Sequence, residues 1–161
     1  MWVRAQVVRM PPYVDLMTTM WDITFDCAAP AALAAFWKLA LGYDDAPPPK
    51  GFDSWDAWFV ANDVPDDERD DGAAIADPDG VRPGISFLKV PEGKTAKNRL
   101  HLDLKVSGGR AQPADSRTER IRATVSRLVE AGGSVLSDFD AHGSLDHVTM
   151  ADPEGNEFCV V

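Results

Sequence analysis

Two stretches of the chain alternate apolar and polar residues, and a helical pattern follows each of them. Residues 21–27 read WDITFDC and residues 99–106 read RLHLDLKV, so apolar side chains occupy every second position in both. Side chains of a β-strand point alternately to its two faces. Each stretch therefore predicts a strand with one apolar face toward a core and one polar face away from it.

The residues after the first strand predict an amphipathic helix. Pro30 suits a first helical position, and Leu33, Phe36 and Trp37 follow at the spacing of one helical face. Gly42 stands where a C-terminal cap is expected. The helix should therefore lay one apolar stripe on the sheet.

The same order of elements returns after the second strand. Ile121, Val125 and Leu128 form the apolar face of a second helix, which the glycine pair at 132–133 ends. The second copy is longer than the first, and we place its additional residues in the polar loop 107–117, where added length costs little. A strand, a helix and a glycine stop thus occur twice, which indicates an internal repeat.

Further strands complete each copy. In the second copy, strands are predicted over residues 134–139 and 145–151, and the turn DPEGN leads into a last strand over 157–161. In the first copy, residues 85–90 read as the closing strand. The pattern is that of a β-α-β-β-β unit.

We therefore predict an α+β fold of two βαβββ modules. The first module would span residues 20–90 and the second residues 98–161, joined by the polar connection 91–97. Residues 1–19 contain two prolines and no clean periodicity, and we treat them as an N-terminal arm.

The middle of the first module contains a cluster of aromatic residues. Asp53 or Ser54 is suited to cap a short helix that carries Trp55, Trp58 and Phe59 on one stripe. These side chains would either cover the edge of the sheet as part of the core or form an aromatic lid over a ligand pocket.

The composition excludes several classes of partner. The chain has a formal net charge of −10 and an acidic run over residues 63–71, so a nucleic acid or an anionic membrane would be repelled. No stretch is long and apolar enough to cross a membrane. Cys27 and Cys159 each lie in an apolar, strand-like run, which fits a reducing compartment better than a disulfide scaffold. We therefore expect a cytoplasmic protein.

Three segments carry a more specific pattern: ITFDCAAPAALAAFW, DPDGVRPGISFLKVPEGKTAKNRLHLDL and ADPEGNEFCVV. Together they resemble the glyoxalase-like domain family of the vicinal oxygen chelate superfamily, which includes glyoxalase I, bleomycin-resistance proteins and extradiol dioxygenases. The resemblance covers nearly all of residues 21–161. It implies that the strands of both modules curl into a mixed and antiparallel cleft with the helices outside, and it implies a homodimer.

The resemblance also places the metal ligands of many relatives on the first and last strands of each module. In those relatives a glutamate follows the asparagine of the terminal turn by three residues, and Cys159 has that place here. The other places are taken by Asp22, Leu88 and His101. This set lacks the donors that nickel, magnesium, manganese or iron require. We therefore expect no metal cofactor, with a zinc site of Asp22, His101 and Cys159 as the alternative.

The register of the last strand decides this interpretation. Glu157 and Cys159 share one face of the strand, and Phe158 and Val160 share the other. We expect Phe158 to be buried beneath the second helix and Cys159 to lie near His101 in the cleft. A slip of one residue would reverse these positions. In the expected register, Cys159→Glu would be tolerated and would restore a hard oxygen donor.

The polar face of the predicted cleft is rich in ionisable side chains. We assign His101 as the catalytic proton-transfer group or as a hydrogen-bonding anchor, because nearby carboxylates perturb an imidazole. The predicted ligand-binding residues are Asp22, Asp26, Trp37, Trp55, Trp58, Asp103, Glu157 and Cys159. Lys105 lies on the same face, but the acids favour a small polar or cationic ligand. The alternative is that these residues are merely solvated on an open sheet.

Three classes of function fit these features. The first, which we prefer, is a metal-free protein that binds or sequesters a small molecule. The second is a metal-dependent lyase, isomerase or dioxygenase of the superfamily. The third is a non-catalytic interaction module. Fold resemblance alone does not choose between them.

Overall fold

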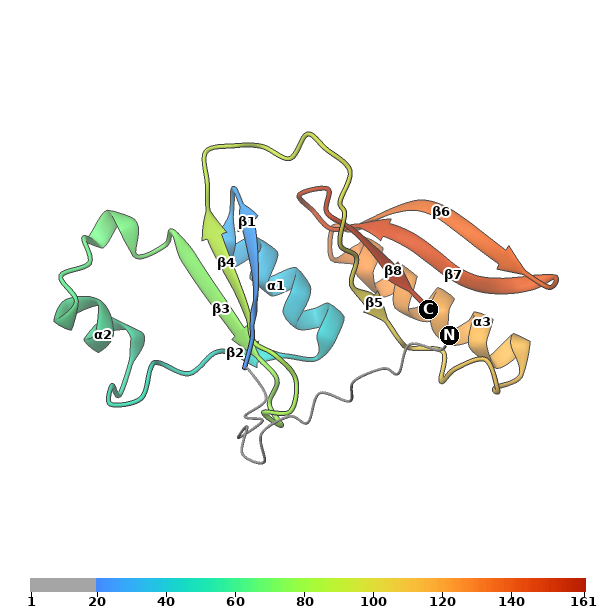
Figure 1. Ribbon diagram of the computed structural model, residues 1–161, viewed down its shortest axis with the longest axis horizontal. Helices are drawn as coiled ribbons and strands as arrows, with labels where there is room; N and C mark the ends of the chain where they lie inside the picture. Colours follow the sequence, from blue (N-terminus) through green and yellow to red (C-terminus); the bar gives the residue numbers. More distant parts are fainter. Residues whose placement is uncertain (1–19) are drawn as a thin grey trace, which may run out of the picture.

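The two predicted repeats form two four-stranded sheets, as the computed structural model shows for residues 20–161 (Figure 1). The predicted arm, residues 1–19, lies outside the described residues. None of the helices within residues 20–161 is long and apolar enough to span a membrane.

The first sheet has the strand order β1-β4-β3-β2. Its elements are β1 (Ile23–Cys27), α1 (Pro30–Leu41), β2 (Asp44–Asp45), α2 (Trp55–Ala61), the 3₁₀ helix η1 (Asp66–Glu68), β3 (Gly72–Ala76) and β4 (Ile85–Lys89). The opening strand β1 lies parallel to the closing strand β4, and the remaining pairs are antiparallel.

The second sheet repeats this arrangement with the order β5-β8-β7-β6. Its elements are β5 (Asp103–Leu104), α3 (Ala114–Glu130), β6 (Ser134–Ala141), β7 (Ser144–Ala151) and β8 (Glu157–Val160). Again the opening strand lies at the sheet edge, parallel to the closing strand. The two opening strands therefore occupy equivalent places, which confirms the repeat and the α+β fold of two βαβββ-like modules.

Helix α1 begins and ends at the predicted residues. Pro30 is its first residue, and Gly42 follows its last residue with φ 70°, the left-handed conformation that glycine adopts without strain. The N–H of Gly42 donates to the carbonyl of Lys38 at 2.9 Å. Local sequence signals therefore set both ends of this helix.

Helix α3 begins earlier than predicted. We expected residues 107–117 to form the longer loop of the second copy, but the helix includes residues 114–117. Pro113 precedes it with φ −54°, and the N–H of Arg117 donates to the Pro113 carbonyl at 3.0 Å. The backbone angle that proline imposes suits a helix start, so part of the additional length extends the helix rather than the loop.

Strand β5 is shorter than predicted. Only Asp103 and Leu104 of the stretch 99–106 are in strand conformation, and Leu100 is 71% exposed. Because Asp103 lies opposite Cys159 in parallel register, residues before 101 extend beyond the first residue of β8 and have no strand to pair with. Backbone hydrogen bonds still continue past β5, since the N–H of Val106 donates to the Val161 carbonyl at 2.8 Å.

One core joins the two modules through α1 and β8. The ring of Phe158 lies 5.2 Å from that of Trp37 and 5.9 Å from that of Phe36, both edge to face. As expected, the second helix packs against the strand that carries Phe158, and the aromatic partners of this ring come in addition from the first helix. The indole N–H of Trp37 also donates to the Asp152 carboxylate of the terminal turn at 3.1 Å. The terminal turn and strand are therefore anchored on the helix of the other module.

The same turn caps the start of α1. The carboxylate of Glu154 accepts hydrogen bonds from the backbone N–H groups of Ala28 and Ala29, each at 2.8 Å. The first N–H groups of a helix have no partner within the helix, and its N-terminus favours negative charge. A residue of the second module thus provides the cap that the local sequence of the first module lacks.

The aromatic segment forms the predicted short helix α2. Ser54, one of the two candidate caps, accepts a hydrogen bond from the N–H of Ala57 at 3.1 Å. Trp55, Trp58 and Phe59 pack on one another, with the two indole rings 5.8 Å apart. No residue of α2 is buried, and the helix lies beyond β3, away from both sheets (Figure 1).

Candidate functional site

The register of β8 is the one that the sequence predicts. Phe158 and Val160 are 0% exposed, whereas Glu157 and Cys159 are half-buried on the opposite face. We call this opposite face, which also carries Thr149 of β7, the open face of the second sheet. The register prediction is confirmed.

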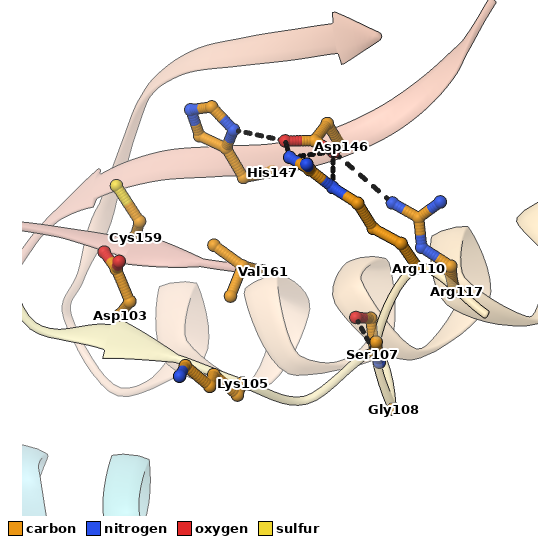
Figure 2. Close-up of a pocket in the computed structure, with 11 residues that line it drawn as sticks. Asp103, Lys105, Ser107, Gly108, Arg110, Arg117, Asp146, His147, Cys159 and Val161 are labelled. Atoms are coloured by element: carbon orange, nitrogen blue, oxygen red, sulfur yellow. Dashed lines mark hydrogen bonds and ion pairs between the residues drawn. The ribbon is translucent and has the colours of Figure 1, made fainter. Parts of the chain in front are cut away.

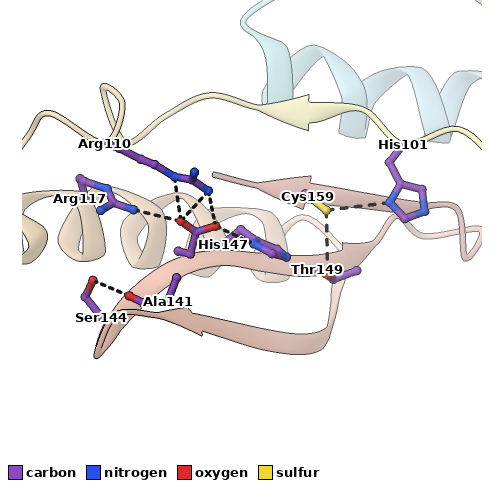
Figure 3. A network of polar contacts seen from close by, with 9 residues as sticks. His101, Arg110, Arg117, Ala141, Ser144, His147, Thr149 and Cys159 are labelled. Carbon is purple, nitrogen blue, oxygen red and sulfur yellow. Dashed lines mark hydrogen bonds and ion pairs between the residues drawn. The ribbon is translucent and has the colours of Figure 1, made fainter.

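Cys159 lies between two polar side chains on the open face. Its Sγ is 4.0 Å from Nδ1 of His101 and 3.9 Å from the hydroxyl of Thr149 (Figure 3). Burial and the neighbouring carboxylate of Asp103 raise the pKa of the Cys159 thiol, while the contact with Thr149 opposes this rise. Cys159 is therefore a neutral thiol at neutral pH.

A cavity of about 730 Å³ lies on the open face, at the C-terminal end of β8 (Figure 2). We call it the large hollow. Its polar lining includes Asp103, Lys105, Arg110, Arg117, Asp146 and His147. Cys159 also lines it, so the large hollow contains two of the predicted ligand-binding residues, Asp103 and Cys159. His101 contacts Cys159 at the edge of this cavity but does not line it.

A β-bulge explains how two neighbouring residues of β7 both line the large hollow. Phe139 pairs with His147 and Asp140 pairs with Leu145, so Asp146 is left without a partner on β6. In a regular strand, Asp146 and His147 would point to opposite faces. The additional residue of a bulge changes the direction of its side chain, and here it brings a carboxylate and an imidazole into one cavity.

Asp146 is the centre of a charged cluster in the large hollow. Its carboxylate accepts from Nε of Arg110 at 3.2 Å and interacts with Nδ1 of His147 at 3.2 Å (Figure 3). Nη2 of Arg117 is 3.6 Å away, which makes an ion pair but not a hydrogen bond. The interaction with His147 and then that with Arg110 lower the pKa of Asp146. The His147 ring stacks on Phe139 with 4.9 Å between centroids.

The charge of the large hollow differs from the expected acid-lined cleft. Three basic side chains, those of Lys105, Arg110 and Arg117, face two carboxylates, those of Asp103 and Asp146. Arg110, Arg117 and Asp146 were not among the residues predicted from the sequence. One signal was present for Arg117, because it stands one helical turn before Ile121 on the stripe that α3 buries.

A second cavity of about 430 Å³, which we call the small hollow, lies between the modules. It is lined by Phe25, Asp26 and Trp37 of the first module and by Leu102 and Glu157 of the second. Three of the predicted ligand-binding residues, Asp26, Trp37 and Glu157, are thus brought together here.

Glu157 already has partners in the small hollow. Its carboxylate accepts from the N–H of Asn98 at 2.7 Å and lies 3.6 Å from the ammonium of Lys94. These interactions, the Asn98 hydrogen bond first, lower the pKa of Glu157. The carboxylate is therefore ionised at neutral pH and holds the connection between the modules in place.

The remaining predicted site residues lie outside both cavities. Asp22 accepts a hydrogen bond from the N–H of Gly84 at 2.8 Å, which links the start of β1 to the start of β4. Trp55 and Trp58 line neither hollow, and the indole N–H of Trp55 donates to the carbonyl of Ala46 at 2.9 Å. A ligand role for these three residues stays a prediction.

Comparison with known proteins identifies the family. The sequence pattern described as "Glyoxalase-like domain" matches residues 22–161, which is most of the chain. The chain belongs to the glyoxalase-like domain family. Among curated proteins, no match to the sequence was found.

Solved structures share this fold at low sequence identity. A hypothetical protein from S. aureus is 16% identical, with 89% of this chain and 96% of that chain covered and a TM-score of 0.54. A glyoxalase/bleomycin resistance protein/dioxygenase family enzyme from Burkholderia phytofirmans is 13% identical, with 86% and 93% covered and a TM-score of 0.52. A mutant of the fosfomycin resistance protein FosX from Listeria monocytogenes, complexed with Mn(II), is 10% identical, with 90% of each chain covered and a TM-score of 0.56.

The residues of this glyoxalase-like domain do not fit the divalent metal that such relatives hold. Within residues 20–161, no group of three His, Cys, Asp or Glu side chains is placed to bind a metal ion. Of the four ligand places, Leu88 offers no donor, Cys159 is a neutral thiol, and Asp22 is bonded to the backbone of Gly84. The imidazole of His101 and the second oxygen of Asp22 remain as donors, and two donors without a third nearby are too few for a hard cation.

Proposed function

We propose that this glyoxalase-like domain binds a small polar molecule in the large hollow without a divalent metal. The observation that carries the proposal is the placement of Cys159, a neutral thiol in the place of the usual ligand glutamate, in the lining of a cavity with several charged side chains. His101, whose Nδ1 lies 4.0 Å from the Cys159 sulfur, keeps its assignment as the proton-transfer or anchoring group.

The construction of the large hollow supports this proposal. Asp103, Arg117, Asp146, His147 and Cys159 come from β5, α3, β7 and β8, which are held by the sheet and the core, while Lys105 and Arg110 come from the loop between β5 and α3. Ligand sites typically combine a concave surface with a few fixed polar groups, and those built on regular elements are more precise than those on loops. The cavity volume of about 730 Å³ is large enough for a small molecule.

Backbone NMR of the EDTA-treated protein tests this proposal. A small library of neutral, cationic and anionic fragments should shift the amide signals of Asp103, Ser107 and Cys159, since these residues line the large hollow. Metal analysis before EDTA treatment should find no bound divalent ion. A stoichiometric metal lost with EDTA would favour the metal-dependent lyase, isomerase or dioxygenase instead. A library that shifts none of these signals would favour the non-catalytic interaction module.

A second candidate ligand is a small cation in the small hollow. The carboxylates of Asp26 and Glu157 lie there with the aromatic rings of Phe25 and Trp37, and such rings attract cations. Tetramethylammonium should then shift the amide of Asp26, and Asp26→Asn should weaken the shift, whereas Asp56→Asn on α2 should not. An equal response of both variants would count against the cation.

We also propose a homodimer, on family resemblance alone. Light scattering at micromolar concentration should give twice the mass of the chain, and a monomer would contradict it.

A further inference from the structure

We propose that the large hollow binds the oxyanion group of its ligand, a carboxylate or a phosphate, between Arg110, Arg117 and Lys105. This inference rests on the proposed function and names the chemistry of the ligand. It goes against the acid-lined cleft that the sequence suggested. Charge, burial and access each support it.

The charges in the Asp146 cluster do not balance. The single carboxylate of Asp146 forms ion pairs with the guanidinium groups of both Arg110 and Arg117. Lys105 adds a third positive charge to the same cavity, and Asp103 supplies the only other side-chain carboxylate among the residues that line it. Guanidinium and carboxylate groups pair one to one when they form bidentate hydrogen bonds. The side chains that line the large hollow therefore carry one more positive charge than negative charge.

The burial of Arg117 is the second observation. The residue is only 9% exposed and lies on the buried stripe of α3 with Ile121 and Leu128. Within residues 20–161 its Nε is buried and has no hydrogen-bond partner. A buried charge without enough partners costs free energy. Proteins tend to keep such a group only where it has a function. Asp146 lies 3.6 Å from Nη2 of Arg117, too far for a hydrogen bond, so an incoming oxyanion would supply an acceptor that this guanidinium lacks.

Access to Arg117 depends on Arg110. The Arg110 side chain is 82% exposed and lies over Asp146 from the loop before α3 (Figure 2). Gly108 and Gly109 precede it with φ 79° and 89°, which other residues rarely adopt, so the sequence of this loop sets the direction of Arg110. An exposed ion pair contributes little to stability. The Arg110 guanidinium can therefore exchange Asp146 for a ligand oxyanion at small cost.

The role of Asp146 then follows from competition. In the absence of ligand, its carboxylate neutralises part of the positive charge and holds His147 through Nδ1. A bound oxyanion would take the Arg110 hydrogen bonds and leave Asp146 with His147 and Arg117. Asp146 is thus a positioning residue that weakens anion binding, whereas in a cation site it would be the principal ligand.

NMR of the Arg side-chain Nε–Hε groups tests this inference on the full chain after EDTA treatment. Inorganic phosphate and sodium acetate should each give saturable shifts at Arg110 and Arg117, and sodium chloride at the same ionic strength should not. Shifts with phosphate alone would identify a phosphate ligand, and shifts with both would identify any oxyanion. If neither anion gives saturable shifts there, the inference is wrong, while neutral fragments that still bind would leave the proposed function intact.

Three variants sharpen the test. Arg110→Gln should weaken anion binding roughly tenfold, the loss expected for a hydrogen bond to a charged group. Arg122→Gln is the matched control, because Arg122 lies on α3 with a similar partner, Asp138, at 3.1 Å but does not line the large hollow. Asp146→Asn should strengthen anion binding several-fold. Equal binding by the Arg110 and Arg122 variants, or weaker binding by the Asp146 variant, would overturn the inference.

Discussion

The two repeats have the same strand order and a shared core, yet their open faces differ. In the first sheet, the edge strand β2 is only two residues long, and the face that carries Thr24 and Asp26 lines the small hollow against the second module. In the second sheet, β6 and β7 form a hairpin of two eight-residue strands, whose bulge places Asp146 beside two arginines. The buried faces thus preserve the fold, while the open faces are free to differ. We expect function to lie where the second repeat departs from the first.

A substitution in the shared core should have the largest effect on the free energy of unfolding, and it should destabilise both repeats together. Phe158→Ala removes a ring that contacts Phe36 and Trp37 across the module boundary, so it should lower the free energy of unfolding by about 3–5 kcal/mol. Urea denaturation followed by fluorescence and by circular dichroism should show one transition shifted for both probes. Leu100→Ala, at an exposed position, is the control.

Two separate transitions in the Phe158 variant, one for each module, would show that the repeats fold independently. In that case the contacts between α1 and β8 would contribute little, and the comparison between the sheets would be one between two domains.

A substitution of Asp146 should have a smaller effect on the free energy of unfolding, and a substitution on the first sheet should lack this effect. Its hydrogen bonds with His147 and Arg110 lower its pKa in the folded state, so they stabilise the fold at pH values above the unfolded-state pKa near 3.8. This stabilisation is lost as the pH falls through the lower, folded-state pKa. Asp146→Asn should therefore lower the free energy of unfolding by about 1 kcal/mol at pH 7. The same type of substitution on the first sheet, Asp26→Asn, should leave the free energy of unfolding unchanged, because Asp26 is exposed.

Urea titrations from pH 7 to pH 3 measure this difference. The stability of the Asp146 variant and that of the parent protein should converge toward the acid end. A constant difference across this range would mean that the carboxylate charge has no part in it.

The fold could be predicted from the sequence because its signals are local and repeated. Pro30 and Gly42 set the ends of α1, and alternation gave both opening strands and the register of β8. The ends of β5 depend on where its partner strand begins, which the stretch 99–106 alone does not contain. The start of α3 had a local signal in Pro113, which we did not use.

The candidate site was predicted less well than the fold. Alternation correctly placed Cys159 near His101, since Cys159 is in the regular strand β8 and His101 lies two residues before β5. It failed for Asp146, because a bulge breaks the two-residue period on which the reasoning rests. It also missed Arg110, whose position depends on two glycines with positive φ in a loop without periodicity. Site residues carried by irregular backbone leave no periodic signal.

The smallest expected effect is on metal binding, when Cys159 is replaced by the glutamate that metal-binding relatives have at this place. The sequence suggested that Cys159→Glu would restore a hard donor beside His101 and Asp22. The structure now leads us to expect no binding, because Asp22 is held by the Gly84 N–H on the first sheet and Leu88 adds no donor. A new carboxylate beside His101 would give two ligands, whereas nickel and manganese require more.

Calorimetric titration of the parent protein and of Cys159→Glu with nickel, manganese and zinc measures this difference. Both should bind each ion negligibly, and circular dichroism should confirm that the variant is folded. The double variant Leu88→His with Cys159→Glu is the sharper comparison, because it fills places on both sheets. Tight, stoichiometric binding by Cys159→Glu alone would mean that Asp22 readily leaves Gly84. Residues of the two repeats would then still be able to form one metal site, and the single substitution at Cys159 would account for its loss.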